Sequence, residues 1–291
     1  MFEEVLSETF SVFFKNIAYY GIIILIVSLP VMLLSYGLVA STLGMDLYTN
    51  QSDSFKMLRN FGDPSAMQDL NEKNMQSQKD LLEKFTLPNI GLLCLGGLIL
   101  GLLNLMTHIS SVLITDSSCQ QQNFNLSNIL SRAARKLPGL MVIAIIMGLA
   151  CFFSGILIVT IPLSIYLAAK FSLSLPIYVM EDVSPFDAIS RSFDLTRGKE
   201  WSIIGVVVII SVLSMVVSWV FGLLSTVAGV ISPNIAVILT TQTIVKLVQS
   251  LVMIMLYISV YLFYAKTVGL VPMKGKFEQQ WNVPKAEYPQ Y

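Results

Sequence analysis

The chain has 291 residues, of which 55% are hydrophobic and 12% are charged, and its mean hydropathy is +0.72. A soluble domain usually carries about twice that charged fraction, and the apolar residues here cluster in runs of roughly 20, the length that crosses a bilayer. The composition excludes a soluble globular protein and predicts an all-α, polytopic membrane helix bundle in one integral membrane domain, residues 1–291. The net formal charge is zero, so nothing indicates nucleic acid as a partner.

Residues 1–16 are the first predicted amphipathic surface helix, with four apolar side chains on one face: Phe2, Leu6, Phe10 and Phe13. The first span is expected over Ile17–Val39, and it contains Pro30 near its middle. We expect a kink there and not a break, because neighbouring helices satisfy the carbonyl that a proline frees.

Residues 45–88 form the only sizeable polar segment between spans. The segment is too short for a domain with its own core. Asp63-Pro64 is expected to start a helix that ends at about Phe85. We interpret the segment as an extracytoplasmic loop that caps the bundle or binds another membrane or periplasmic protein.

Five more spans are predicted beyond this loop. A second span, Ile90–Thr115, is followed by a surface helix within 120–137 that Pro138-Gly139 ends. Residues 140–180 hold two spans with a turn between Ser154 and Pro162, and the last two spans are Ser202–Leu224 and Thr243–Tyr264.

Residues 184–198, between the fourth and fifth spans, have the pattern of a short helix with both ends marked. Ser184 is a suitable N-cap, Asp187 has capping-box spacing, and Gly198 suits the left-handed turn after the helix. The apolar face holds Phe186, Ile189 and Phe193. These features predict an amphipathic helix lying on a membrane surface.

The three surface helices suggest a repeat. Each is expected to precede a pair of spans, which predicts three copies of one unit, a surface helix followed by a transmembrane hairpin. Six spans place both termini on one side of the membrane. Lys and Arg concentrate on that side, whereas 45–88 carries five basic and seven acidic residues. The positive-inside rule then makes the termini and the surface helices cytoplasmic.

The run from Leu173 to Trp201 resembles a known signature. It matches bacterial six-span membrane proteins related to the membrane domain of glycerophosphoryl diester phosphodiesterases at these positions: Pro176, Glu181, Ala188, Ser192, Leu195, Thr196, Gly198 and Trp201. Lys170 and Lys15-Asn16 also fall where the family has similar residues. The resemblance implies a bacterial plasma (inner) membrane protein of mostly unassigned activity, and the 45–88 loop is longer than the family pattern.

Catalysis is not expected. The phosphodiesterase reaction of that family belongs to a separate soluble barrel with paired histidines and carboxylate metal ligands, whereas this chain has one histidine, His108. No acidic residue falls within the predicted spans, so an intramembrane hydrolase that uses Asp or Glu is not expected. We therefore expect no enzyme, no metal site and no cofactor.

Polar residues within the spans are the candidate ligand-binding or packing groups. Asn104 and His108 share a face of the second span, whereas Gln242, Lys246 and Gln249 share a face of the sixth. Ionisable groups at membrane depth suggest function, although interhelical hydrogen bonds would account for Asn104 and His108 and snorkelling for Lys246.

Lys170 in the fourth span is expected to pair with Asp187 or Asp194, which would tether the surface helix. A ligand site at Lys170 is the alternative. Three tyrosines of the sixth span are interpreted as aromatic anchors at an interface: Tyr257, Tyr261 and Tyr264.

These observations favour a non-catalytic module that binds membrane lipids or partner proteins as a scaffold or accessory subunit. The alternative is a small transporter or lipid-translocating protein that uses the polar faces of the second and sixth spans.

Overall fold

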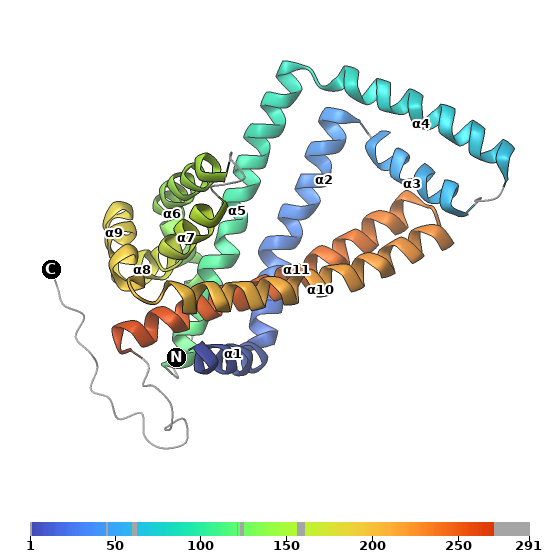
Figure 1. The fold of residues 1–291 in the computed structure, drawn as a ribbon. Helices are drawn as coiled ribbons and strands as arrows, with labels where there is room; N and C mark the ends of the chain where they lie inside the picture. Colours follow the sequence, from blue (N-terminus) through green and yellow to red (C-terminus); the bar gives the residue numbers. More distant parts are fainter. Residues whose placement is uncertain are drawn as a thin grey trace. The chain divides into compact units, whose positions relative to one another are not determined.

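The computed structural model describes residues 2–44, 46–59, 63–120, 122, 125–155 and 161–270. These residues form α-helices and one π-helical turn, and no strand occurs among them (Figure 1). In chain order the elements are α1 (Phe2–Ile23), the π-helical turn η1 (Ile24–Ser28), α2 (Leu29–Leu43), α3 (Asp46–Arg59), α4 (Pro64–Lys84), α5 (Leu87–Cys119), α6 (Leu126–Gly155), α7 (Ile161–Phe171), α8 (Ser174–Glu181), α9 (Pro185–Thr196), α10 (Glu200–Ile231) and α11 (Ile235–Val268).

Six segments are long and apolar enough to cross a membrane, which confirms the predicted all-α, six-span fold. They are Phe2–Leu43, Leu87–Cys119, Leu126–Ala150, Pro162–Glu181, Glu200–Ile231 and Ile235–Val268. The helices extend beyond the predicted spans because an apolar run marks only the part of a helix that fits the hydrocarbon layer. The turn predicted between Ser154 and Pro162 lies largely outside the described residues. Residues 271–291 also lie outside them, including Lys274 and Lys276, which belong to the basic residues expected on the side of the termini.

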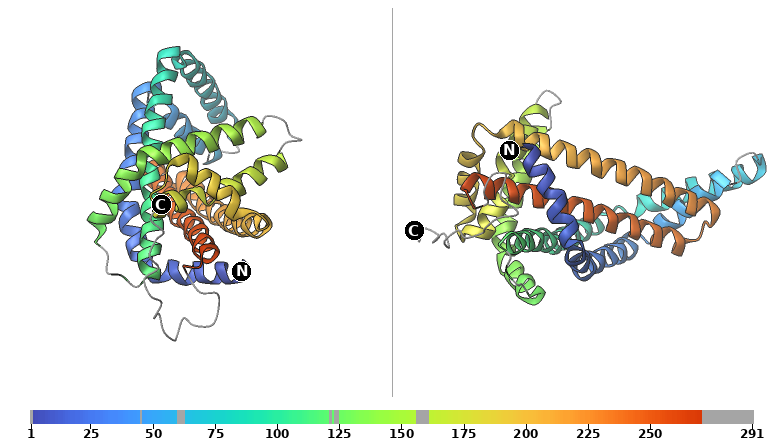
Figure 2. Two further views of the ribbon diagram at one scale, coloured as in Figure 1. Left: turned by 90° about the vertical axis from the view of Figure 1, so that its left-hand side faces the viewer. Right: turned by 90° about the horizontal axis from the view of Figure 1, so that it is seen from below.

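The described residues divide into two compact units. Unit 1 comprises residues 2–23, 105–212 and 252–270, and unit 2 comprises residues 24–104 and 213–251. In unit 1, the short helices α7, α8 and α9 follow one another and pack together with α6 (Figures 1 and 2). In unit 2, Ser225 of α10 and Thr241 of α11 are joined by a 3.1 Å hydrogen bond close to the turn between these helices.

The first predicted surface helix does not end at residue 16. Helix α1 continues to Ile23 without a break at Asn16, whose amide donates to the Val12 carbonyl at 2.9 Å and to Ser118 Oγ of α5 at 2.9 Å. Pro30 lies at the start of α2, directly after η1. A π-helical turn is one way in which a helix accommodates a proline that cannot donate a backbone hydrogen bond. The chain therefore stays helical through Pro30, as expected.

The second predicted surface helix also differs from expectation, because Pro138 lies inside α6. The prediction that Pro138-Gly139 ends the helix was wrong. The space beside Gly139 is filled by Tyr178 of α8, whose hydroxyl and ring would overlap a Cβ at this position. Gly139 thus permits close approach of α6 and α8.

Only the third predicted surface helix is a separate element. Helix α9 is bounded at both ends by non-helical residues, whereas 1–16 and 120–137 contribute to the beginnings of longer helices as far as they are described. The threefold repeat of a surface helix followed by a transmembrane hairpin stays a prediction. Helix α9 is separate from its neighbours because Asp182 and Gly198, which precede and follow it, have left-handed backbone conformations that interrupt the helix.

The 45–88 segment is largely helical. The predicted helix from Asp63-Pro64 is confirmed as α4, but α3 was not foreseen. The sequence of α3 is rich in weak helix formers, and the helix is held by contacts in unit 2. Ser52 Oγ donates to the Pro233 carbonyl in the turn between α10 and α11 at 2.6 Å, and the ring of Phe55 lies over Gly229 of α10.

Candidate functional site

Helix α9 is held at both ends by the residues that the sequence indicated. Ser184 Oγ accepts a hydrogen bond from the Asp187 backbone N–H at 3.2 Å and donates one to the Asp187 carboxylate at 2.6 Å. Gly198 has φ +76°, a left-handed conformation that glycine adopts without strain. The capping prediction is therefore confirmed, and the caps give α9 fixed ends.

The face that α9 buries is not the apolar face named from the sequence. Ala188, Ser192 and Thr196, spaced four residues apart, are each 0% exposed, whereas Phe186 is 67% exposed. Phe193 is half-buried and packs edge-on against Phe171 of α7. Small side chains let α9 approach its neighbours closely. Three of the signature residues thus form one buried stripe.

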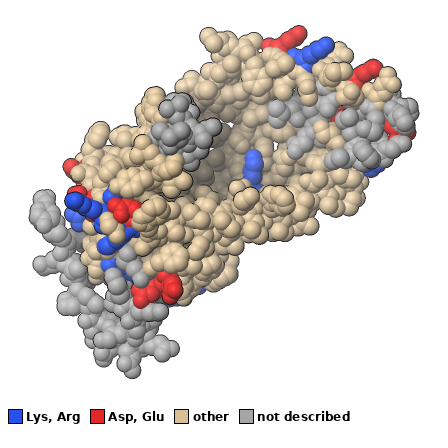
Figure 3. All heavy atoms as spheres, in the orientation of Figure 1, with Lys and Arg blue, Asp and Glu red and all other residues tan. Residues whose placement is uncertain are grey.

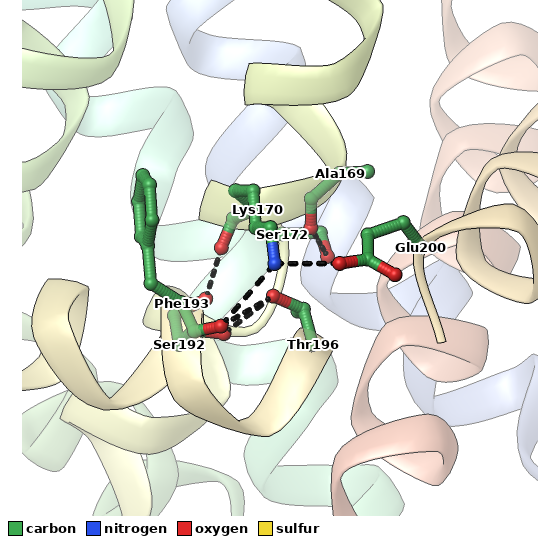
Figure 4. Close-up of polar contacts among 7 residues, drawn as sticks. All are labelled: Ala169, Lys170, Ser172, Ser192, Phe193, Thr196 and Glu200. Atoms are coloured by element: carbon green, nitrogen blue, oxygen red, sulfur yellow. Dashed lines mark hydrogen bonds and ion pairs between the residues drawn. The ribbon is translucent and has the colours of Figure 1, made fainter. Parts of the chain in front are cut away.

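Beneath this stripe, the fourth span is interrupted between α7 and α8, and three serines satisfy its carbonyls. Ser172 Oγ donates to the Ala169 carbonyl at 2.7 Å, and Ser174 Oγ donates to the Phe171 carbonyl at 2.5 Å. Ser192 Oγ of α9 donates to the Lys170 carbonyl at 2.5 Å (Figure 4). Carbonyls freed by a broken span must find donors, because lipid supplies none. Here α9 supplies one of those donors.

Lys170, near the end of α7, contacts both α9 and α10 at this break in the fourth span. Its ammonium pairs with Glu200 Oε1 at the start of α10 at 2.7 Å, and it lies 3.4 Å from the Phe193 carbonyl of α9 (Figure 4). The expectation that its partner is Asp187 or Asp194 was wrong, because those carboxylates lie on the exposed side of α9. Lys170 nevertheless contacts α9, through the Phe193 carbonyl and the Ser192 hydroxyl.

Two further signature residues, Glu181 and Trp201, lie near these contacts. We call the contacts among Lys170, Glu181, Arg191, Ser192 and Glu200 the joint around α9. Glu181, the last residue of α8, accepts from Tyr264 Oη of α11 at 2.9 Å and pairs with Arg191 Nε of α9 at 2.8 Å. Lys136 of α6 pairs with Asp182 beside it. Trp201 follows the joint at the start of α10 and is 84% exposed. Ion pairs and hydrogen bonds thus connect α9 to the helices around it.

Comparison with known proteins identifies the family of this chain. The sequence profile described as the membrane domain of glycerophosphoryl diester phosphodiesterase matches residues 142–287. The chain belongs to this family. The match begins within α6 and takes in the interrupted span, α9 and both long helices that follow. The matched description names a membrane domain and no catalytic domain. Comparison with curated proteins and with solved structures gave no match.

The other predicted polar residues fall in both units. His108, in unit 1, stacks on Tyr257 of α11 with ring centroids 4.1 Å apart, and its Nδ1 is buried without a hydrogen-bond partner. Asn104, in unit 2, accepts from Ser28 Oγ at 3.5 Å. Among the described residues no ion pair reaches His108 or Asn104, and their contacts agree with interhelical packing and hydrogen bonding.

The second polar face lies within the family match, on α11 in unit 2. Gln242 is half-buried, whereas Lys246 and Gln249 are exposed. The Lys246 ammonium lies 4.7 Å from the centroid of the Tyr36 ring of α2. The structure therefore keeps these three side chains together, as the helical spacing predicted, and adds an aromatic partner from the first span.

Three acidic residues of unit 1 that bond to buried side chains were missed from the sequence. Asp116 lies within α5, and Tyr261 Oη of α11 donates to its Oδ1 at 2.6 Å. Lys266 pairs with Glu8 at 2.8 Å and lies 3.7 Å from Glu4. Asp116 was overlooked because it lies one residue beyond the predicted end of the span.

The interpretation of the tyrosines of the sixth span was also wrong for two of them. Tyr261 and Tyr264 are buried, each 1% exposed, and their hydroxyls bond to Asp116 and Glu181. They connect helices of unit 1. The helical spacing of Tyr261 and Tyr264 was visible in the sequence, whereas their acidic partners, 145 and 83 positions away, were not.

The joint around α9 is suited to holding helices together. Its carboxylates face lysine, arginine or tyrosine side chains, and its serines bond to backbone carbonyls. Among the described residues, no group of three or more His, Cys, Asp or Glu is placed to hold a metal ion. The geometry supports fixing the position of a surface helix.

Proposed function

We propose that the protein is a non-catalytic membrane module that engages lipid through the joint around α9. One observation carries this proposal: α9 buries its small residues against the bundle and exposes Phe186, while Trp201 is exposed at the start of the next span. Tryptophan is enriched where a membrane meets water. The joint thus holds two aromatic side chains outward from a rigid support.

The distribution of charge agrees with this proposal. On the visible face in Figure 3, the flanks of the long helices are covered mainly by uncharged residues. Around α9, Arg197 is exposed beside the helix end, and Lys199 donates to Thr267 Oγ1 of α11 at 3.3 Å. Basic residues next to exposed aromatic ones favour contact with anionic lipid.

Tryptophan fluorescence in vesicles that contain brominated lipids tests the proposal. With Trp219 and Trp281 replaced by Phe, Trp201 should be quenched most strongly by bromines close to the head groups. The matched control keeps Trp219, an exposed residue farther along α10, and replaces Trp201 and Trp281. It should be quenched most by bromines near the middle of the acyl chains. Absence of lipid quenching at Trp201 would refute the proposal.

We further propose a bacterial plasma membrane location with cytoplasmic termini, on the positive-inside argument. In a variant without native cysteines, Q76C on α4 should react with an impermeant maleimide on intact cells. S190C on α9 should react only after the cells are permeabilised. The reverse pattern would invert the orientation.

Partner binding through the 45–88 segment stays a prediction. Met75 and Leu82 of α4 are exposed, which makes them suitable positions for a photo-crosslinking residue. Failure to capture any protein from either position in living cells would contradict this prediction.

A further inference from the structure

Three polar side chains on α11 in unit 2 have no hydrogen-bond or ion-pair partner among the described residues. Gln242, Lys246 and Gln249 occur at positions i, i+4 and i+7 of α11 and so share one face of the helix. Among the described residues no hydrogen bond or ion pair reaches any of their side-chain polar atoms. The Lys246 ammonium lies over the Tyr36 ring. Lys170 and Lys266, by contrast, are paired with carboxylates.

The position of Lys246 makes an unpaired charge costly. It follows the first residue of α11 by 11 positions, which corresponds to roughly 16 Å of helix. The hydrogen bond between Ser225 and Thr241 sets the register of α10 and α11, and it places Lys246 at the level of Val220. Val220 is exposed, as are the nearby Trp219 and Leu223. Lys246 therefore lies at a level where the helices face lipid, and a charge there needs a counter-charge.

The spans of unit 2 contain no such counter-charge. The segments 24–45, 85–104 and 213–251 have no Asp or Glu, and Lys246 is their one charged residue. The acidic residues of this unit are confined to 46–84, where Asp53, for example, pairs with Lys56 at 2.6 Å. A negative ligand would supply the missing charge.

Tyr36 adds a further donor beside the lysine. Its ring lies against the ammonium, and its buried hydroxyl has no hydrogen-bond partner in the part of the chain that the structure describes. Tyr48 of α3 packs edge-on against the same ring and donates a long hydrogen bond, 3.5 Å, to the Tyr36 carbonyl. Contacts with Tyr48 thus hold Tyr36 in place, and its hydroxyl is available to donate a hydrogen bond to a ligand.

From these observations we infer that Gln242, Lys246 and Gln249, together with Tyr36, bind a phosphate-type oxyanion within the membrane. An ammonium, two amides and a hydroxyl offer donors to such a group, and no carboxylate competes for them. The anion is either the head-group phosphate of an anionic lipid or free inorganic phosphate. This site goes beyond the lipid contact proposed at α9 and uses different residues, so that either proposal can fail without the other.

Native mass spectrometry of the delipidated protein tests the inference with two probes, phosphatidylglycerol and inorganic phosphate. We expect Lys246→Gln to weaken binding of the preferred probe by roughly tenfold or more, and Lys246→Arg to retain most of it. The matched control is Lys79→Gln, an exposed lysine of α4 in the same unit, which should leave binding unchanged. Tyr36→Phe keeps the ring and should weaken binding to a smaller degree.

The two probes distinguish the source of the anion. Binding of phosphatidylglycerol that depends on Lys246, with phosphatidylcholine bound equally by all variants, assigns the site to a lipid head group. Binding of inorganic phosphate with the same dependence assigns it to free phosphate. If Lys246→Gln does not fold, the double variant Gln242→Leu/Gln249→Leu replaces it, with a several-fold loss expected. Unchanged binding of both probes in the folded variants overturns the inference.

Discussion

Ser192 shows how a single hydroxyl supports the interrupted fourth span. Its Oγ donates to the Lys170 carbonyl at 2.5 Å, and the residue is 0% exposed. Its role was not visible in the sequence, because the acceptor is 22 positions away. The resemblance to a family signature marked the position, and the structure explains it as docking of α9.

Replacing Ser192 by Ala should destabilise unit 1. The change leaves a buried carbonyl without its donor, which costs about 1–3 kcal/mol. Thermal or denaturant unfolding in detergent measures the loss. Ser190→Ala on the exposed side of the same helix is the control and should change the unfolding free energy by less than about 0.5 kcal/mol. Equal effects of the two variants would contradict the assigned role.

Close approach of helices depends on where small residues lie along each element. In α9 the buried positions are Ala188, Ser192 and Thr196, and in α6 Gly139 lies against Tyr178 of α8. The sequence pattern located the caps of α9 but misassigned its buried face. By hydrophobicity alone, Phe186 is a better candidate for burial than Ala188. The distance between two packed helices depends on side-chain size, however, so the small residue is the one that lies in the contact.

Gly139→Ala tests the close approach of α6 and α8. The added Cβ overlaps the Tyr178 side chain, so we expect a loss of about 1–3 kcal/mol in unfolding free energy. Gly148→Ala in the same helix meets nothing within 4 Å and should be neutral or stabilise by up to about 1 kcal/mol. The difference between the two variants in one unfolding assay is the measurement. A destabilised G148A beside an unaffected G139A would refute the packing argument.

At the scale of the whole molecule, two units with different polar organisation share one chain. Unit 1 contains the ion pairs of Lys170, Lys266 and Glu181. Unit 2 confines its acidic residues to 46–84 and carries Lys246 within its spans. Helix α3 belongs to unit 2, where it contacts the turn between α10 and α11.

Phe55→Ala should release α3 without disturbing unit 1. The ring lies over Gly229, where a Cβ would come within 2.8 Å of it, and its removal forfeits up to about 3 kcal/mol of packing. Hydrogen–deuterium exchange should then increase in α3 while the amides of α9 stay protected. Phe85→Ala, at an exposed position, should leave both helices unchanged. Faster exchange of α9 in F55A would contradict a role of Phe55 that is confined to the contacts of α3 in unit 2.

The sequence by itself determined the fold class, the number of spans, the helix α4 and the caps of α9. These features depend on the length of apolar runs and on local turn chemistry, which involve residues close together in the chain. Tertiary structure alone decided that Lys170 pairs with Glu200, that Tyr261 bonds to Asp116, and that Pro138 lies inside a helix. Those outcomes depend on which helices become neighbours, and apolar runs of similar composition do not specify their neighbours. The break in the fourth span was also decided by tertiary structure, because one of the serines that bond to its carbonyls comes from α9.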